Sequence, residues 1–419
     1  MKSTVRLQLS VMMFVEFFIW GSWFVTLGTF LVNNLHANGA ETGQVFSTQS
    51  WGAIIAPFII GLIADRYFNA EKILGVLHLA GAALMYHMYT VGVVTDVYPT
   101  SFFYYLLIYM ILFMPTLALV NSIAFNKMND PEKEFSSIRV WGTIGWIVAG
   151  LLISLVFLWD AEANVKAGLM RNTFLLASIA SLALGVFSFT LPKTPPKVAP
   201  GTKVTVSDIL GLDALKLLKN KNFLIFFIAS ILICIPLAFY YQVANQFLSN
   251  IGVTKPTGKM AIGQASEVLF LLALPFFFKK FGFKKTILIG MLAWAIRYAL
   301  FAYGNAGDLS FMLIIGIALH GVCYDFFFVS GQIYTNAKAG IKYKSAAQGL
   351  ITLATYGIGM LIGFKIAGLI TDAYTNGGMF DWKMIWIIPA GIAFVVFLLF
   401  AVSFNDKNEK PIVDQSLNI

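Results

Sequence analysis

Charged residues are scarce in this sequence. Asp, Glu, Lys and Arg together make up 12% of its 419 residues, whereas hydrophobic residues make up 58%. A soluble domain carries about 25% charged residues, so this composition excludes an ordinary water-soluble protein. Apolar runs of roughly 18 or more residues recur along the whole length, and such runs are typical of transmembrane helices. The composition therefore predicts an all-α polytopic membrane protein.

Cysteine and histidine are also rare. Cys234 and Cys323 both lie inside apolar runs, which argues against a disulfide framework. The four histidines show no spacing such as H-E-x-x-H, so we expect neither a metal site nor another cofactor. The sequence offers no nucleophile–base pair and no soluble output domain. A membrane-embedded enzyme or sensor is therefore disfavoured.

The apolar runs predict about twelve spans, with ends uncertain by roughly 2–4 residues. They lie near residues 9–33, 44–64, 73–94, 101–126, 137–159, 169–191, 222–249, 258–278, 286–304, 310–335, 345–371 and 382–404. A long polar interruption divides them into two six-helix halves. We expect an N-terminal half over residues 1–191, a linker with a short amphipathic helix over 192–221, a C-terminal half over 222–404 and a tail over 405–419.

The basic residues are distributed unevenly about these spans. If the N-terminus is cytoplasmic, 22 of the 29 Lys and Arg residues fall on the cytoplasmic side and five on the other. This bias fits the positive-inside rule and predicts that both termini are cytoplasmic. The net charge of +9 is therefore explained by topology, and no nucleic-acid partner is expected.

The two halves resemble one another. A short charged connection follows the second span, "GLIADRYFNAEKIL" at 61–74, and another follows the eighth, "LPFFFKKFGFKKTIL" at 274–288. Two repeated halves are the expected layout of a secondary transporter that rocks about a site at mid-depth. The first connection, with Gly61, Asp65 and Arg66, also resembles the loop of the major facilitator superfamily that controls this motion, although Tyr67 replaces the usual glycine.

Ionisable side chains inside spans are functional candidates, because even low estimates of their cost are about 2.5–3.5 kcal/mol at the bilayer centre. Glu267 lies near the middle of the eighth span, with Gln264 on the same face. Together they can bind several hydroxyls of one ligand, and Glu267 can bind and release a proton. The alternative is a neutral acid that is hydrogen-bonded to a neighbouring helix.

A second polar stripe occurs in the fifth span. Arg139, Thr143 and Trp146 fall at i, i+4 and i+7, which places a guanidinium, a hydroxyl and an indole on one helix face. Such a face suits a polar solute that contains a ring. Alternatively, Arg139 extends to the cytoplasmic surface and binds nothing.

The tenth span contains a third stripe, in which His320, Tyr324 and Phe328 are spaced four residues apart. Asp325 points away from this stripe. We expect it to form a structural ion pair with Arg297 of the ninth span, which would satisfy two buried charges. Asp325 is also a candidate for proton coupling.

Two further positions remain open. Gln242 and Asn245 supply amides among the aromatic residues of the seventh span, where packing and substrate binding are equally supported. Glu16 in the first span is a candidate for a second proton-handling group.

Several ordered blocks resemble the nucleoside:H+ symporter family of the major facilitator superfamily. They are "WGSWFVTLGTF" (20–30), "GLIADR" (61–66), "MPTLALVNS" (114–122), "IRVWGTIG" (138–145), "ILGLDALKLLKN" (209–220), "QASEVLFLLALPFFF" (264–278), "WAIRYALFAYG" (294–304), "YDFFFVSG" (324–331) and "SAAQGL" (345–350). The resemblance implies proton-driven uptake of nucleosides across the bacterial inner membrane. The facilitator layout needs no partner subunit, so we expect a monomer.

By the same resemblance, five residues are expected to hold the nucleoside and Trp146 to stack on its base. The five are Arg139, Thr143, Gln264, Glu267 and Tyr324. The sequence departs from the family where Glu16 replaces an amide, His320 replaces a tyrosine, and Ala238 and Tyr241 occupy the slots of a Gln–x–x–Asn pair. A facilitator-superfamily carrier for another polar solute, a sugar or a nucleobase, is therefore the alternative.

Overall fold

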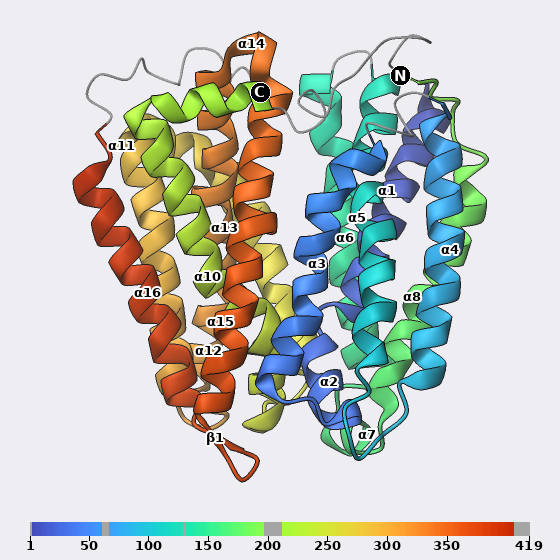
Figure 1. Ribbon diagram of the computed structural model, residues 1–419, viewed down its shortest axis with the longest axis vertical. Coiled ribbons are helices and arrows are strands. Elements are labelled where there is room, and N and C mark those ends of the chain that lie inside the picture. The colour runs from blue at the N-terminus through green and yellow to red at the C-terminus, as the bar shows by residue number, and fades with distance from the viewer. Residues whose placement is uncertain (1, 61–66, 129–130, 197–211, 406–419) are drawn as a thin grey trace. The chain divides into compact units, whose positions relative to one another are not determined.

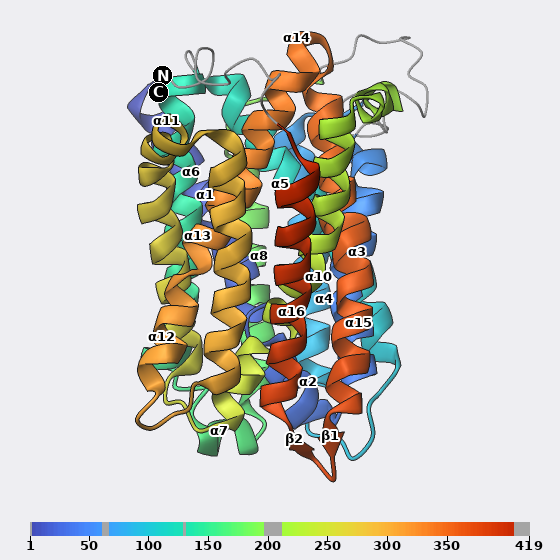
Figure 2. The same ribbon diagram turned by 90° about the vertical axis from the view of Figure 1, so that its left-hand side faces the viewer.

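The computed structural model describes residues 2–60, 67–128, 131–196 and 212–405. Within these ranges, ten helices are long and apolar enough to cross a membrane. One of them, α11 (Pro256–Tyr303), contains two predicted spans, because Gly282 at φ 73° and ψ 176° reverses the chain direction between them (Figure 2). A further helix, α3 (Gly39–Ile59), covers most of the predicted run 44–64. The predicted all-α polytopic membrane fold is confirmed.

The chain forms two compact units. Unit 1 comprises residues 1–205 and 254–261, and unit 2 comprises residues 206–253 and 262–419. The predicted gating loop at Gly61, Asp65 and Arg66, the first part of the linker at 197–211, and the tail from 406 onward lie outside the described residues. Of the expected amphipathic linker helix, the described part is a 3-10 helix at Leu212–Lys219.

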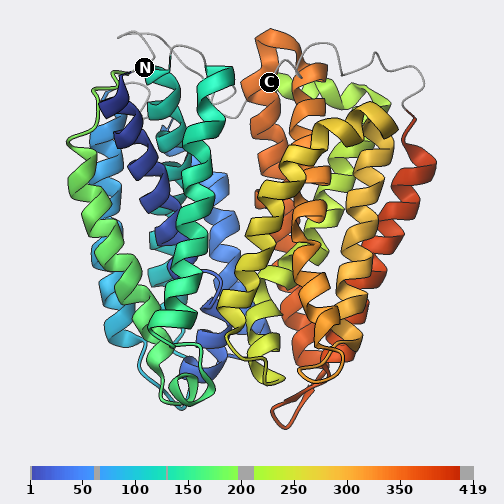
Figure 3. The same ribbon diagram turned by 180° about the vertical axis from the view of Figure 1, so that it is seen from behind.

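Unit 1 is a helical bundle (Figures 1 and 3). Its elements are α1 (Ser3–Trp23), α2 (Leu27–Leu35), α3, α4 (Ala70–Val91), α5 (Ser101–Lys127), α6 (Pro131–Leu151), a π-helical turn (Leu152–Val156), α7 (Glu162–Lys166), a 3-10 turn (Leu169–Arg171) and α8 (Asn172–Ser188). The closest helix pairs are α1 with α6, α4 with α8, and α3 with α5.

Unit 2 is a second helical bundle with one small hairpin. Its elements are the 3-10 helix at Leu212–Lys219, α10 (Lys221–Asn250), most of α11, α12 (Ser310–Ala318), α13 (His320–Tyr324), a π-helix (Asp325–Val329), α14 (Ser330–Thr352), a second π-helix (Leu353–Gly359), α15 (Met360–Ala373), β1 (Thr375–Asn376), β2 (Met379–Phe380) and α16 (Trp382–Ser403). The antiparallel β1–β2 hairpin joins α15 to α16 (Figure 2). Both cysteines lie in this unit, and both are free and fully buried.

Unit 1 also holds the first turn of α11. The Asp160 carboxylate accepts the Thr257 backbone N–H at 3.0 Å and the Ser154 hydroxyl. Ser154 Oγ in turn accepts the Gly258 backbone N–H at 2.7 Å. The first N–H groups of a helix have no partner within it, and an acidic side chain is favoured beside them. These contacts therefore fix where α11 begins.

Glycine allows the close approach of α1 and α6. A Cβ atom built on Gly145 of α6 would lie 2.1 Å from the Phe14 carbonyl oxygen of α1, and one on Gly21 of α1 would lie 3.0 Å from the Trp146 Cα atom. Small residues at such contacts let membrane helices pack backbone to backbone. This contact sets the position of α6, the helix that carries Arg139, Thr143 and Trp146.

We therefore predict that Gly145→Ala lowers the thermal unfolding temperature of the purified transporter. The added methyl group overlaps backbone atoms of α1, and overpacking of this kind costs about 1–3 kcal/mol. Gly391→Ala in α16 is the matched control, because a Cβ atom there meets nothing within 4 Å. Equal unfolding temperatures for the two variants would show that α1 and α6 can separate without cost.

Candidate functional site

The polar stripe of the fifth span lies on α6, beside α1. The Arg139 guanidinium carbon lies 4.0 Å from the centroid of the Phe17 ring, in a cation–π contact. The Trp146 ring packs edge-on against Trp20 at 5.4 Å between centroids. All three stripe residues are half-buried, and the Thr143 hydroxyl has no hydrogen-bond partner among the described residues. The stripe thus presents a cation, a hydroxyl and an aromatic ring, and α1 contacts the cation through Phe17 and the ring through Trp20.

Gln264 and Glu267 lie one turn apart on α11, and both are half-buried. Their position depends on the contact between α11 and α13. Ser266 Oγ accepts the Gly321 backbone N–H at 2.9 Å, and a Cβ atom on Gly321 would lie 2.5 Å from the Ser266 backbone. Glycine at position 321 therefore brings α13 directly against the turn that carries Glu267.

The third predicted stripe forms a continuous row of rings. The Tyr324 ring lies 5.9 Å from the His320 ring and 5.0 Å from the Phe328 ring, between centroids. The Tyr324 hydroxyl is hydrogen-bonded to the Tyr356 hydroxyl at 2.9 Å. Sequence reasoning missed Tyr356, which lies in the second π-helix and has no local signal that connects it to Tyr324.

The expected ion pair between Arg297 and Asp325 is wrong. Arg297 is fully buried, and its Nη1 atom lies 3.0 Å from His320 Nδ1. Its guanidinium carbon lies 3.7 Å from the centroid of the Tyr240 ring. Arg297 is thus stabilised by an imidazole and an aromatic face instead of a carboxylate. His320 is consequently occupied by this contact and is 3% exposed.

Asp325 is instead a buried carboxyl group within electrostatic range of Glu267. It begins the π-helix that follows α13, its side chain is 3% exposed, and its Oδ2 atom has no hydrogen-bond partner among the described residues. The Glu267 charge lies within electrostatic range of Asp325, Tyr241 and Tyr324. Unit 2 therefore gathers two acids and two phenols around the same turn of α11.

Gln242 and Asn245 lie in α10 and are almost completely buried, at 1% and 2% exposure. They are held inside unit 2, close in sequence to Tyr240 and its Arg297 contact. In this respect they differ from the half-buried Gln264 and Glu267.

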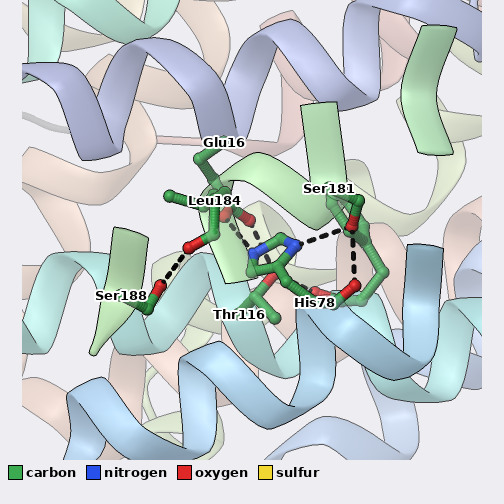
Figure 4. Close-up of polar contacts among 7 residues, drawn as sticks. Glu16, His78, Thr116, Ser181, Leu184 and Ser188 are labelled. Atoms are coloured by element: carbon green, nitrogen blue, oxygen red, sulfur yellow. Dashed lines mark hydrogen bonds and ion pairs between the residues drawn. The ribbon is translucent and has the colours of Figure 1, made fainter. Parts of the chain in front are cut away.

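Glu16 has a partner that the sequence analysis did not predict. It is fully buried in unit 1 and pairs with His78 of α4 at 2.8 Å (Figure 4). His78 lies inside the predicted span 73–94, so the rule that nominates ionisable residues within spans also applies to it. Among the described residues, no three His, Cys, Asp or Glu side chains come together in a way that would hold a metal ion.

Comparison with known proteins gives one consistent family. The family model described as nucleoside H+ symporter matches residues 1–409. The chain is 43% identical to the putative nucleoside transporter YegT of Escherichia coli strain K12, over 98% of this chain and 96% of the relative. It is 34% identical to xanthosine permease of the same strain, over 97% and 98% of the two chains. A crystal structure of nucleoside transporter NupG superposes with a TM-score of 0.83 at 31% identity, over 96% of this chain and 99% of that one. The chain is therefore a member of the nucleoside:H+ symporter family, with the fold of the major facilitator superfamily.

Proposed function

We propose that the Gln264–Glu267 face and the ring row of unit 2 contact the nucleoside in this proton-coupled transporter. We also propose that the α6 stripe of unit 1 is a surface that contacts the nucleoside. The observation that carries the proposal is the position of Glu267, a half-buried acid one turn from Gln264, on the turn of α11 that Gly321 of α13 packs against. Its charge lies within electrostatic range of Tyr241, Tyr324 and Asp325. Family membership favours a nucleoside over the sugar or nucleobase alternative.

The α6 stripe suits the base of a nucleoside. Trp146 is half-buried and packs edge-on against Trp20, so its ring is held in place and can stack on a flat base. Stacking of a base on an aromatic side chain is worth about 1–3 kcal/mol. Arg139 and Thr143 add hydrogen-bond donors along the same face, where polar edges of the base require them.

The unit 2 face suits the ribose. A carboxylate accepts hydrogen bonds from hydroxyl groups, and an amide both donates and accepts them. Glu267 and Gln264 are one turn apart, so both can contact neighbouring hydroxyls of one sugar. Tyr324, fixed by its bond to Tyr356, supplies a further hydroxyl. His320, Gln242 and Asn245 are more deeply buried, and we assign them to the support of this face.

Glu267 and Asp325 are proposed to carry the coupled proton. Two carboxylates within electrostatic range repel one another when both are charged, and the burial of Asp325 makes its charged form costly. A proton on one of them removes both penalties. Hydroxyls that bind to Glu267 change this balance, and nucleoside binding is thereby linked to proton binding.

Glu267→Gln is expected to abolish accumulation of labelled nucleoside against its gradient in proteoliposomes with an inward proton gradient. The amide still binds hydroxyls but cannot exchange a proton, so nucleoside exchange in the absence of a gradient should persist. The control is Glu162→Gln, because Glu162 is exposed and lies outside the spans. The hydrogen bond from Lys166 lowers the pKa of Glu162, so this carboxylate stays charged at neutral pH. Undiminished accumulation by Glu267→Gln would remove this residue from the coupling mechanism.

Trp146→Ala is expected to weaken nucleoside binding about 5- to 150-fold, which is the loss of about 1–3 kcal/mol of stacking. Trp146→Phe, which keeps an aromatic face, should lose much less. Trp141→Ala on the same helix is the control, because Trp141 is exposed. Affinities would be measured by calorimetry on purified, folded variants. Equal affinities for the Trp146→Ala and Trp141→Ala variants would place the base elsewhere.

We also infer that both termini are cytoplasmic in the bacterial inner membrane and that the transporter works as a monomer, because the facilitator layout contains a whole carrier in one chain. The orientation rests on the bias of basic residues. A C-terminal green fluorescent protein fusion should fluoresce, and a C-terminal alkaline phosphatase fusion should be inactive. A dark green fluorescent protein fusion together with an active alkaline phosphatase fusion would place the C-terminus on the opposite side of the membrane.

A further inference from the structure

Unit 1 contains a buried polar cluster assembled from four helices (Figure 4). Glu16 of α1, His78 of α4, Thr116 of α5 and Ser181 of α8 are each 0–1% exposed. Buried ionisable groups in membrane spans are costly, and they mark functional sites more often than structural ones. This cluster lies outside the group of residues around Glu267 in unit 2, and transport by that group does not account for it.

The hydrogen bonds define where protons sit. The Ser181 hydroxyl donates to the His78 carbonyl oxygen at 3.0 Å, so Ser181 Oγ is left to accept from His78 Nδ1 at 3.1 Å. Nδ1 therefore carries a hydrogen. His78 Nε2 and Glu16 Oε2 are 2.8 Å apart, and this contact requires a proton between them. The pair thus holds one shared proton, either as imidazolium and carboxylate or as two neutral groups.

Thr116 provides room for one more proton. Its Oγ1 atom lies 2.6 Å from Glu16 Oε1 and also 2.6 Å from the Phe113 carbonyl oxygen. One hydroxyl hydrogen can point at only one of these acceptors. When it points at Glu16, that carboxylate accepts two hydrogen bonds. When it points at Phe113, Oγ1 is free to accept from a proton on Oε1, and the pair gains a positive charge without movement of any heavy atom.

A row of aromatic rings connects this cluster to the proposed base platform. Trp146 contacts Trp20 at 5.4 Å between ring centroids, Trp20 contacts Phe113 at 5.8 Å, and Phe113 contacts the His78 ring at 6.3 Å. Phe113 also supplies the carbonyl that competes for the Thr116 hydrogen. Packed rings that adopt two arrangements can carry energetic coupling between sites.

Among the described residues, few other titratable groups face Glu16 and His78. On α5, Tyr109 lies within electrostatic range of Glu16. On α6, Arg139 covers the ring of Phe17, the residue that follows Glu16. The helix α8 contributes the Ser181 hydroxyl, which does not titrate.

We propose that Glu16 and His78, with Thr116 and Ser181, form a second proton-binding site of the transporter, separate from Glu267 and Asp325. The site takes up a proton on Glu16 Oε1 when the helices around it open and releases it in the other half of the cycle. One additional proton therefore accompanies each nucleoside. This inference rests on the proposed function, because it assigns a coupled ion to a nucleoside carrier.

Glu16→Gln is the main test. The glutamine oxygen still accepts from Thr116, and its amide nitrogen donates to His78 Nε2, so the network is kept while the titrating group is lost. In proteoliposomes, the slope of nucleoside accumulation against the imposed proton gradient gives the number of protons per nucleoside. This number is expected to fall by one. A slope equal to that of the wild type would overturn the proposal.

Thr116→Val tests the additional proton itself. It keeps Glu16 and His78 but removes the acceptor for a proton on Oε1, so it should lower the slope in the same way. Ser178→Ala is the matched control, because Ser178 also bridges α8 to α4, through a 2.8 Å bond to the Ala82 carbonyl, without a titratable partner. It should keep the wild-type slope. A wild-type slope for Thr116→Val, or a lowered slope for Ser178→Ala, would contradict the assignment.

Infrared difference spectra between acid and neutral pH report the protonation of carboxyl groups directly. They therefore test the proposal even if the Glu16 variant does not transport. The wild type should show the C=O stretch of a carboxylic acid that appears at acid pH, and the folded Glu16→Gln protein should lack one component of this band. Identical spectra would identify the cluster as structural. Failure of the proposed function is distinguishable, because the wild type itself would then show no accumulation driven by a proton gradient.

Discussion

The interior of a lipid bilayer offers no water to hydrogen-bond polar groups, and the structure depends on this constraint. A helix satisfies most backbone groups of a span within the span itself, so helices are the dominant element among the described residues. Small hydroxyl side chains obey the same constraint. Those of Ser22, Ser230 and Thr335 each donate to a carbonyl four residues earlier on the same helix. Charged side chains inside a span have no such local partner and need one on another helix. Their positions therefore indicate contacts between helices that are candidates for a functional role.

Two buried charges show different solutions to this problem. Arg297 is stabilised by the imidazole of His320 and the face of Tyr240, so its charge is spread over groups that carry none of opposite sign. Glu16 instead shares a proton with His78. The first arrangement is fixed, since a guanidinium does not lose its proton in proteins. The second is adjustable, because the shared proton lies between two groups that can each carry it. A charge that does not change, such as that of Arg297, can hold helices in position. A pair that gains and loses a proton, such as Glu16 and His78, can couple transport to a proton gradient.

Features that lie within one helix could be predicted from the sequence, since apolar length and helical periodicity decide them. The rows Arg139–Thr143–Trp146 and His320–Tyr324–Phe328 are of this kind. Contacts between helices could not be predicted, because no local pattern links Glu16 to a histidine 62 residues away. The expected partner of Arg297 was wrong for a related reason. It was chosen by charge alone, whereas Arg297 contacts the His320 imidazole and the Tyr240 ring, and no local pattern specifies these partners.

The scarcity of cysteine has a practical consequence. Cys234 and Cys323 are both free and 0% exposed, enclosed by α10, α13 and their neighbours in unit 2. Water-soluble maleimides react with thiolates that solvent can reach, so the native chain should be nearly silent to them. A single cysteine introduced at a loop or helix end would then carry a fluorophore or spin label against a clean background. The opening and closing of this transporter can therefore be followed by spectroscopy in the natural sequence, without first replacing its own thiols.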